Sequence, residues 1–249
     1  TGIGYNALTA NTTADNNTAI GSNALAANTT GASLVAVGSQ ALQSHTTANS
    51  CTAVGFNALN ANTTGANNTA IGAGSLDLNT TGTLNVAAGA ASLDANTTGS
   101  RNTAVGYQAL SANTTADNNT AIGLNALLVN TTGTNNVAMG SGSLDANTTG
   151  NNLTAIGYAA LTSNTTADNN TALGYNVLSS NTTGTHNIGI GGNDATNLAT
   201  LANNTTGSQN IGIGMAALLN NTTADNNTAV GYQSLRANTS GTGNTAVGA

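Results

Sequence analysis

A single glycine recurs at a constant interval along almost the whole chain, and this spacing constrains the fold more than any other feature. A unit of about 17 residues cannot bury its own apolar face and becomes stable only when it stacks on copies of itself. The sequence therefore predicts a repeat protein whose functional surfaces lie on the outer faces and at the ends of the stack. After one longer step, from Gly191 to Gly214, the series resumes; its members are Gly4, Gly21, Gly38, Gly55, Gly72, Gly89, Gly106, Gly123, Gly140, Gly157, Gly174, Gly191, Gly214, Gly231 and Gly248.

When each unit is numbered from this glycine as position 0, its apolar residues fall into columns. Position +4 is leucine in every complete unit, position −1 is Ile, Val, Leu or Met except at Ala88, and position −3 is Thr, Val or Ile. Residues two apart point to the same side of a strand, so we expect positions −3 and −1 to face inward. The predicted core therefore contains Ile20, Leu25, Val105, Leu110, Ile122, Leu127, Ile156 and Leu161.

The rest of the unit predicts a second short strand or extended corner and two turns. The leucine at +4 is flanked by Ala or Ser at +3, so one large side chain fills a narrow interior in each layer. Positions +7 to +10 read Asn, Thr, Thr or Ser and often Gly, which tolerate positive φ or bond nearby backbone at corners. Stacked amides can hydrogen-bond from layer to layer. We expect such a ladder at +7, broken only by His45 and including Asn96, Asn113, Asn130 and Asn147.

These patterns predict an all-β fold, a parallel β-solenoid with one rung per repeat and about fifteen rungs. We treat residues 1–249 as one repeat domain, expected to be a window of a longer fibre or a rod that joins others end to end. The one irregularity is a six-residue insertion within about 192–203. We expect this insertion to be a bland bulge, with a protruding contact loop that contains Asn193, Asp194, Thr196 and Asn197 as the alternative.

A longer period lies within the short one. Tyr5, Phe56, Tyr107 and Tyr158 are spaced by 51 residues, so three rungs form a block. Duplication of a three-rung ancestor explains this pattern. The alternative is a surface feature that recurs roughly every 14 Å, at about 4.8 Å per rung.

Composition excludes several functions. Charged residues make up 4% of the chain and the net charge is −6, whereas nucleic-acid binding requires a basic surface. No stretch approaches the ~20 consecutive apolar residues of a membrane-spanning helix, so we expect no membrane insertion. His45 and His186 lie in different columns many rungs apart and cannot share a metal. We therefore expect no catalytic, cofactor or metal site and no enzymatic activity.

An aspartate pair, the single cysteine and the Asn-Thr-Thr segments each have a structural explanation. Asp77 and Asp94, both at +5, fall in adjacent rungs and resemble a carboxylate pair. We expect solvated turn acids there, with a weak cation site as the alternative. Cys51 replaces the usual Asn at −4 and reads as a tolerated small substitute. Asn-Thr-Thr matches the N-glycosylation acceptor pattern, although turn chemistry explains the same residues.

The segments Asn102–Thr115 and Asn227–Ser240 resemble repeats of phage-type tail-fibre proteins, many of which end in an intramolecular chaperone domain. The cores Val35–Gly38 and Val137–Gly140 are similar to head repeats of trimeric autotransporter adhesins. The resemblance implies three parallel chains wound into a left-handed β-roll fibre that contacts a host surface.

The function we expect is a structural and adhesive extracellular fibre on a cell or virion surface. Its partner would be itself, as a homotrimer or end-to-end filament, with cell-surface glycans as a further partner. The alternative is a binder of a repetitive lattice, such as ice or glycan, through its Thr and Asn columns. Thr12 and Thr13 are adjacent, so we expect that Thr column on a turn rather than in a flat array.

Overall fold

The computed structural model describes residues 1–192 and 198–248, and these residues form short strands and turns without a helix. They are described as two units, residues 1–119 with β1 to β7 and residues 120–249 with β8 to β15. The strands are β1 (Gly2–Ile3), β2 (Thr18–Ile20), β3 (Val35–Val37), β4 (Thr52–Val54), β5 (Thr69–Ile71), β6 (Val86–Ala88), β7 (Thr103–Val105), β8 (Thr120–Ile122), β9 (Val137–Met139), β10 (Thr154–Ile156), β11 (Thr171–Leu173), β12 (Ile188–Ile190), β13 (Ile211–Ile213), β14 (Thr228–Val230) and β15 (Thr245–Val247).

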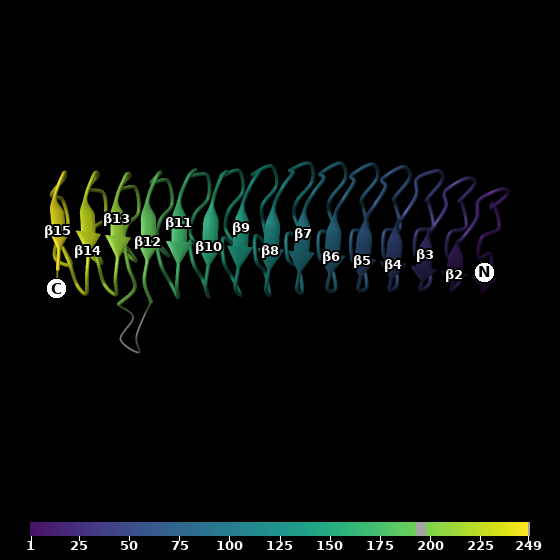
Figure 1. Ribbon diagram of the computed structural model, residues 1–249, viewed down its shortest axis with the longest axis horizontal. Coiled ribbons are helices and arrows are strands. Elements are labelled where there is room, and N and C mark those ends of the chain that lie inside the picture. The colour runs from purple at the N-terminus through teal and green to yellow at the C-terminus, as the bar shows by residue number, and fades with distance from the viewer. Residues whose placement is uncertain (193–197, 249) are drawn as a thin grey trace. The chain divides into compact units, whose positions relative to one another are not determined.

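Within each unit the strands stack in parallel, each one repeat away from the next (Figure 1). In the first unit Val35 pairs with Thr18 on one side and with Thr52 on the other. The chain therefore completes one turn and returns beside itself every 17 residues, the separation that also joins Asn17 Oδ1 to the backbone N–H of Leu34. The predicted parallel β-solenoid is confirmed, with one strand per rung rather than the two that we expected.

The insertion leaves the strand register intact. Ile188 of β12 pairs with Ile211 of β13 although they lie 23 residues apart, the same separation as between Asn187 and Asn210 just before these strands. The candidate contact loop, Asn193, Asp194, Thr196 and Asn197, lies outside the described residues. The rungs on either side of the extra segment thus stack as the others do.

The interior of each rung is filled by one leucine and several small residues. The leucine at +4 has no exposed surface in Leu25, Leu110, Leu127 and Leu161, as predicted. Ala or Ser at +3 is buried beside it, and so is the alanine at −2 in the middle of each interior strand. A fully buried leucine contributes about 1.5–3 kcal/mol of transfer free energy, so this column supplies much of each rung's stability.

The prediction that positions −3 and −1 face inward is wrong. Ile20, Val105 and Ile156 are 40%, 37% and 39% exposed, and Ile122 is half-buried. The strand instead turns position −2 inward, and that column contains only Ala or Gly. The leucine of so short a coil already fills most of the narrow interior, so only a small side chain fits opposite it. The large β-branched residues are therefore left on the outer face of each strand.

The leucine does not lie on a second strand, because its backbone is left-handed. Leu25 has φ 51°, and positive φ recurs at +2, as in Asn23, and at +12, as in Ser33. Positive φ thus marks turn positions +2, +4 and +12, and the chain also bends at +8 and +9, within the corner predicted at +7 to +10. A left-handed leucine costs roughly 1–2 kcal/mol. Burial offsets this cost, and backbone bonds hold the turn: Leu25 N donates to Ala41 O at 3.1 Å and Asn28 N to Leu25 O at 3.3 Å.

The glycine at position 0 is required by both conformation and space. Gly89 has φ +141°, a region that L-amino acids rarely adopt. A Cβ at Gly89 would collide with the carbonyl oxygen of Gly106 in the next rung. The glycine period seen in the sequence therefore marks a point where the next rung leaves no room for a side chain.

Candidate interaction surface

The amide ladder at +7 lies inside the rungs. Asn79 Nδ2 donates to Asn62 Oδ1 at 2.7 Å and to Gly82 O at 3.1 Å, and Asn96 Nδ2 donates to Asn79 Oδ1 at 2.7 Å. Asn113 continues the ladder from Asn96 at 2.8 Å. In the second unit Asn147 Nδ2 donates to Asn130 Oδ1 at 2.8 Å. The predicted ladder is confirmed within each unit, and these side chains are fully buried, so they hold rungs together rather than meet a ligand.

A second amide ladder at −4 was not anticipated. Asn85 Nδ2 donates to Gly99 O at 2.8 Å, and its Oδ1 accepts the backbone N–H of Asn102 at 2.9 Å. Asn68 and Asn102 have no exposed surface either. The recurrence of Asn immediately before each strand was visible in the sequence. The structural role of this Asn could not be predicted from the sequence, because the backbone carbonyl that it hydrogen-bonds belongs to the following rung.

His45 interrupts the +7 ladder on the side of Asn28, whose Oδ1 accepts the backbone N–H of Gly31 instead, and continues it on the side of Asn62. Its Nε2 lies 2.7 Å from Ala48 O, and Asn62 Nδ2 lies 2.8 Å from its Nδ1. These contacts require a neutral ring that donates from Nε2 and accepts at Nδ1. Burial lowers the pKa of His45, although the hydrogen bond to the carbonyl opposes this shift. Protonation would point an N–H at the Asn62 amide donor.

Cys51 performs part of the role of the asparagine that it replaces. Its buried Sγ donates to Gly65 O at 3.2 Å, the equivalent of the carbonyl that Asn85 satisfies. Burial raises the pKa of the thiol, which therefore stays protonated as this donor requires. The residue is a polar substitute inside the ladder as well as a small one.

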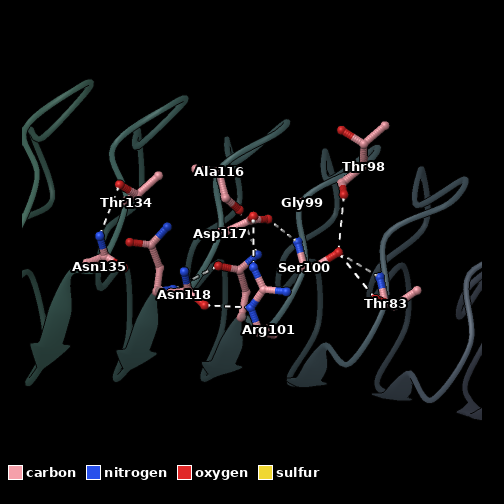
Figure 2. A network of polar contacts seen from close by, with 12 residues as sticks. Thr83, Thr98, Gly99, Ser100, Arg101, Ala116, Asp117, Asn118, Thr134 and Asn135 are labelled. Atoms are coloured by element: carbon pink, nitrogen blue, oxygen red, sulfur yellow. Dashed lines mark hydrogen bonds and ion pairs between the residues drawn. The ribbon is translucent and has the colours of Figure 1, made fainter.

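The aspartates at +11 accept backbone N–H groups of the preceding rung. Asp117 Oδ1 accepts from Ser100 N at 2.7 Å, as Asn151 Oδ1 accepts from Thr134 N at 2.8 Å elsewhere in this column. Figure 2 shows the Arg101 side chain beside this carboxylate. Arg101 Nη2 lies 3.1 Å from Asp117 Oδ2, and its Nε donates to Asn118 Oδ1 at 2.7 Å. Both charged groups are largely exposed, so the ion pair contributes less than about 1 kcal/mol.

The two carboxylates at +5 in the first unit have raised pKa values, chiefly because they are partly buried. Burial raises the pKa of Asp77, and the neighbouring charge of Asp94 adds to the shift. Burial also raises the pKa of Asp94, against hydrogen bonds from Ser111 and the backbone that lower it. Within residues 1–192 and 198–248, no three His, Cys, Asp or Glu side chains gather as a metal site would require.

The outer face of the strands is the most distinctive exposed surface. It presents positions −3 and −1, Thr or aliphatic residues that include Val35, Val54, Ile71 and Val86 among the exposed apolar side chains. Every charged side chain in the described part of the chain stands at +5, +11 or +12, away from these two columns. We call this uncharged surface, positions −3 and −1 of the stacked strands, the strand face.

Aromatic residues follow directly after the strand face. Position +1 carries Phe56 and Tyr107, which are 56% and 54% exposed, and Tyr158 and Tyr175 of adjacent rungs. The last two rings stack with centroids 5.1 Å apart and an interplanar angle of 17°. In these rungs position +1 therefore adds exposed apolar surface beyond the carboxyl end of the strand.

The side-chain hydroxyls of the threonines at +8 hydrogen-bond to the backbone. The hydroxyls of Thr63, Thr80 and Thr97 each donate to the carbonyl of the same position in the next rung, at 3.0–3.1 Å. Neither these hydroxyls nor the buried +7 amides are arranged to meet an external lattice. The amides at +7 and the hydroxyls at +8, two of the columns that the sequence suggested for lattice binding, thus serve rung stacking.

Among the described residues, no helix has the length and apolar character needed to cross a membrane. No protein-family model matches the chain, and no curated protein matches it. The strand face, with the +1 side chains beside it, is the candidate functional surface.

Proposed function

We propose that the chain is part of the shaft of a structural, adhesive extracellular fibre, without catalytic activity, whose copies associate through the strand face. The observation that carries this proposal is the strand face itself, exposed and free of charge on successive rungs. Large exposed apolar side chains recur on it at −1, as in Val54, Ile71 and Val105, and an exposed apolar surface marks interaction sites in soluble proteins.

A second copy of the chain is the occupant that fits the strand face best. An apolar surface without charged groups is matched by another surface without charged groups, since an unpaired charge buried against it would be costly. A copy supplies such a surface with the same rung spacing. Contacts made in one rung can therefore repeat in the next, and rungs too small to be stable alone are stabilised together.

The fibre would act outside the cell, on a cell or virion surface. The charged and amide-bearing turns at +5, +11 and +12 remain free when the strand faces meet. Repetition of these turns supplies many weak polar contacts that sum through multivalency, with cell-surface glycans as the partner we infer. The buried ladders leave the interior with no open position for a substrate.

The proposal is tested by the association state of the full chain in analytical ultracentrifugation. Ile71→Asp places a charge on the strand face, and Thr64→Asp places the same charge on an exposed +9 turn as a matched control. We expect the unsubstituted chain and the Thr64 variant to associate equally and the Ile71 variant to dissociate with an unchanged circular dichroism spectrum. A chain that is monomeric at all concentrations, or an Ile71 variant that associates normally, would refute the proposal.

A second candidate function, binding of a regular lattice such as ice, gains support from the strand face. Thr52 and Thr69 alternate with Val54 and Ile71 at i and i+2 on the outer side of paired strands. This is the flat spacing that the adjacent Thr12 and Thr13 lack. Thermal hysteresis of a cooled solution that disappears in the Ile71→Asp variant would favour this function over self-association.

A further inference from the structure

The residue at −3, at one border of the strand face, is correlated with the residue at +1, just beyond the opposite border. Position −3 is Thr in most described rungs, and each aliphatic exception is followed one rung later by a large apolar residue at +1. These pairs are Val35 with Phe56, Val86 with Tyr107, Val137 with Tyr158, Ile188 with Met215 and Ile211 with Tyr232. The last pair departs from strict repetition of the 51-residue block, because the equivalent pair one block earlier is Thr154 with Tyr175.

Packing within one chain does not explain the correlation. Positions −3 and +1 are four residues apart, at most about 13 Å, with the three-residue strand and the bend at the position 0 glycine between them, so they lie at opposite ends of the strand. Val35 and Phe56 belong in addition to successive rungs, since Val35 pairs with Thr52 of the Phe56 rung. Two side chains so placed do not touch in the same copy.

The two borders meet when copies surround a common axis parallel to the stacking direction. In such a closed ring the contact is heterologous, so the +1 border of one copy lies against the −3 border of the next. If the strands tilt by about 20° out of the plane perpendicular to the axis, toward the preceding rung, the chain shifts by one rung, about 4.8 Å, over the distance of at most about 13 Å from −3 to +1. Position +1 of one rung is then level with position −3 of the preceding rung in the neighbouring copy.

We propose that copies of the chain associate edge to edge in this register, so that Phe56 packs on Val35, and Tyr107 on Val86, of the neighbouring copy. This inference rests on the proposed self-association and adds its geometry. Small residues at +1, such as Ser39 and Ala90, then face threonines. A shift by one rung in either direction would place Phe56, Tyr107 and Tyr158 on threonines, so these three contacts specify the association in steps of three rungs, roughly 14 Å.

A double-mutant cycle tests the contact in the full chain. Phe56→Ser and Val35→Thr introduce residues that the same columns already carry in neighbouring rungs, such as Ser39 and Thr52, so the rungs remain foldable. We expect each single substitution to weaken association roughly 3- to 10-fold, and the double variant to be little weaker than Phe56→Ser alone. The control cycle combines Phe56→Ser with Val86→Thr, for which the effects should multiply.

Disulfide formation between introduced cysteines tests the same contact without a measurement of affinity. In a Cys51→Ser background, Phe56→Cys with Val35→Cys should form a bond between copies, because its geometry requires Cα atoms within about 7 Å. Phe56→Cys with Thr69→Cys should not. If the unsubstituted chain stays monomeric, both the proposed function and this register fail. If it associates but Phe56 and Val35 are uncoupled and no specific cross-link forms, the register alone is overturned.

Discussion

Replacement of one ladder amide by the isosteric acid tests how the rungs are held together. In Asn79 the Nδ2 group donates both to Asn62 Oδ1 and to the carbonyl of Gly82. In Asn79→Asp a carboxylate oxygen replaces that donor and faces two acceptors inside a fully buried site. The substitution changes no volume, so any effect comes from the lost hydrogen bonds and the buried charge.

The expected loss is large for one atom. Each buried acceptor left without its donor costs about 1–3 kcal/mol, and the uncompensated charge adds to this. We expect Asn79→Asp to lower the free energy of unfolding by about 3–5 kcal/mol at neutral pH. Burial raises the carboxyl pKa above its usual ~3.9, so the folded state binds the proton more tightly. Stability should therefore recover in part as pH falls through the raised pKa, because the protonated acid can donate once.

The assay is urea unfolding followed by circular dichroism, with hydrogen exchange across positions 62–96 to locate the effect. Asn79→His is the matched control, because His45 occupies the same ladder position with its Nε2 on the corresponding carbonyl. The control should cost only about 1 kcal/mol, for the one donor that it loses to Asn62. An Asn79→Asp variant as stable as the unsubstituted chain at neutral pH would refute the ladder as the element that joins the rungs.

Three further outcomes follow from single residues. Leu93→Ala should destabilise the first unit by about 2–5 kcal/mol in urea unfolding, whereas Asp117→Asn, which keeps the acceptor oxygen for Ser100 N, should change it by less than about 1 kcal/mol. Because the pKa of His45 is below its ordinary value of 6.5, the unfolded chain binds its proton first, so stability should fall as pH drops below about 6.5. His45→Asn should remove this dependence, and a melting temperature that falls equally in both proteins would contradict it. Gly89→Ala should abolish native strand signal around that rung in hydrogen exchange, because the added Cβ meets the Gly106 carbonyl.

The sequence predicted the repeat, the leucine column and the +7 ladder because these depend only on period and composition. The strand face was assigned to the wrong side, since alternation shows that −3 and −1 share a side but not which side is inward. The composition of the column between them, position −2, indicates which side is inward. Ala19, Ala36 and Ala53 are members of a column restricted to Ala or Gly, as a narrow interior requires.

Other features depend on contacts that a single repeat does not contain. Leu25 adopts a left-handed backbone that leucine disfavours by itself, and its burial between stacked rungs and its bond to Ala41 of the next rung stabilise it. The −4 ladder likewise satisfies groups of the next rung. The strand face became a candidate site only after the structure showed it exposed, because its residues alone are those of an ordinary core.

Cryo-EM reconstruction of the native assembly tests the central claim most directly. We expect several copies in each cross-section, with Val54, Ile71 and Val105 turned toward neighbouring copies and the charged turns outside. A cross-section of one copy, with these residues on the free surface, would contradict a shaft built through the strand face.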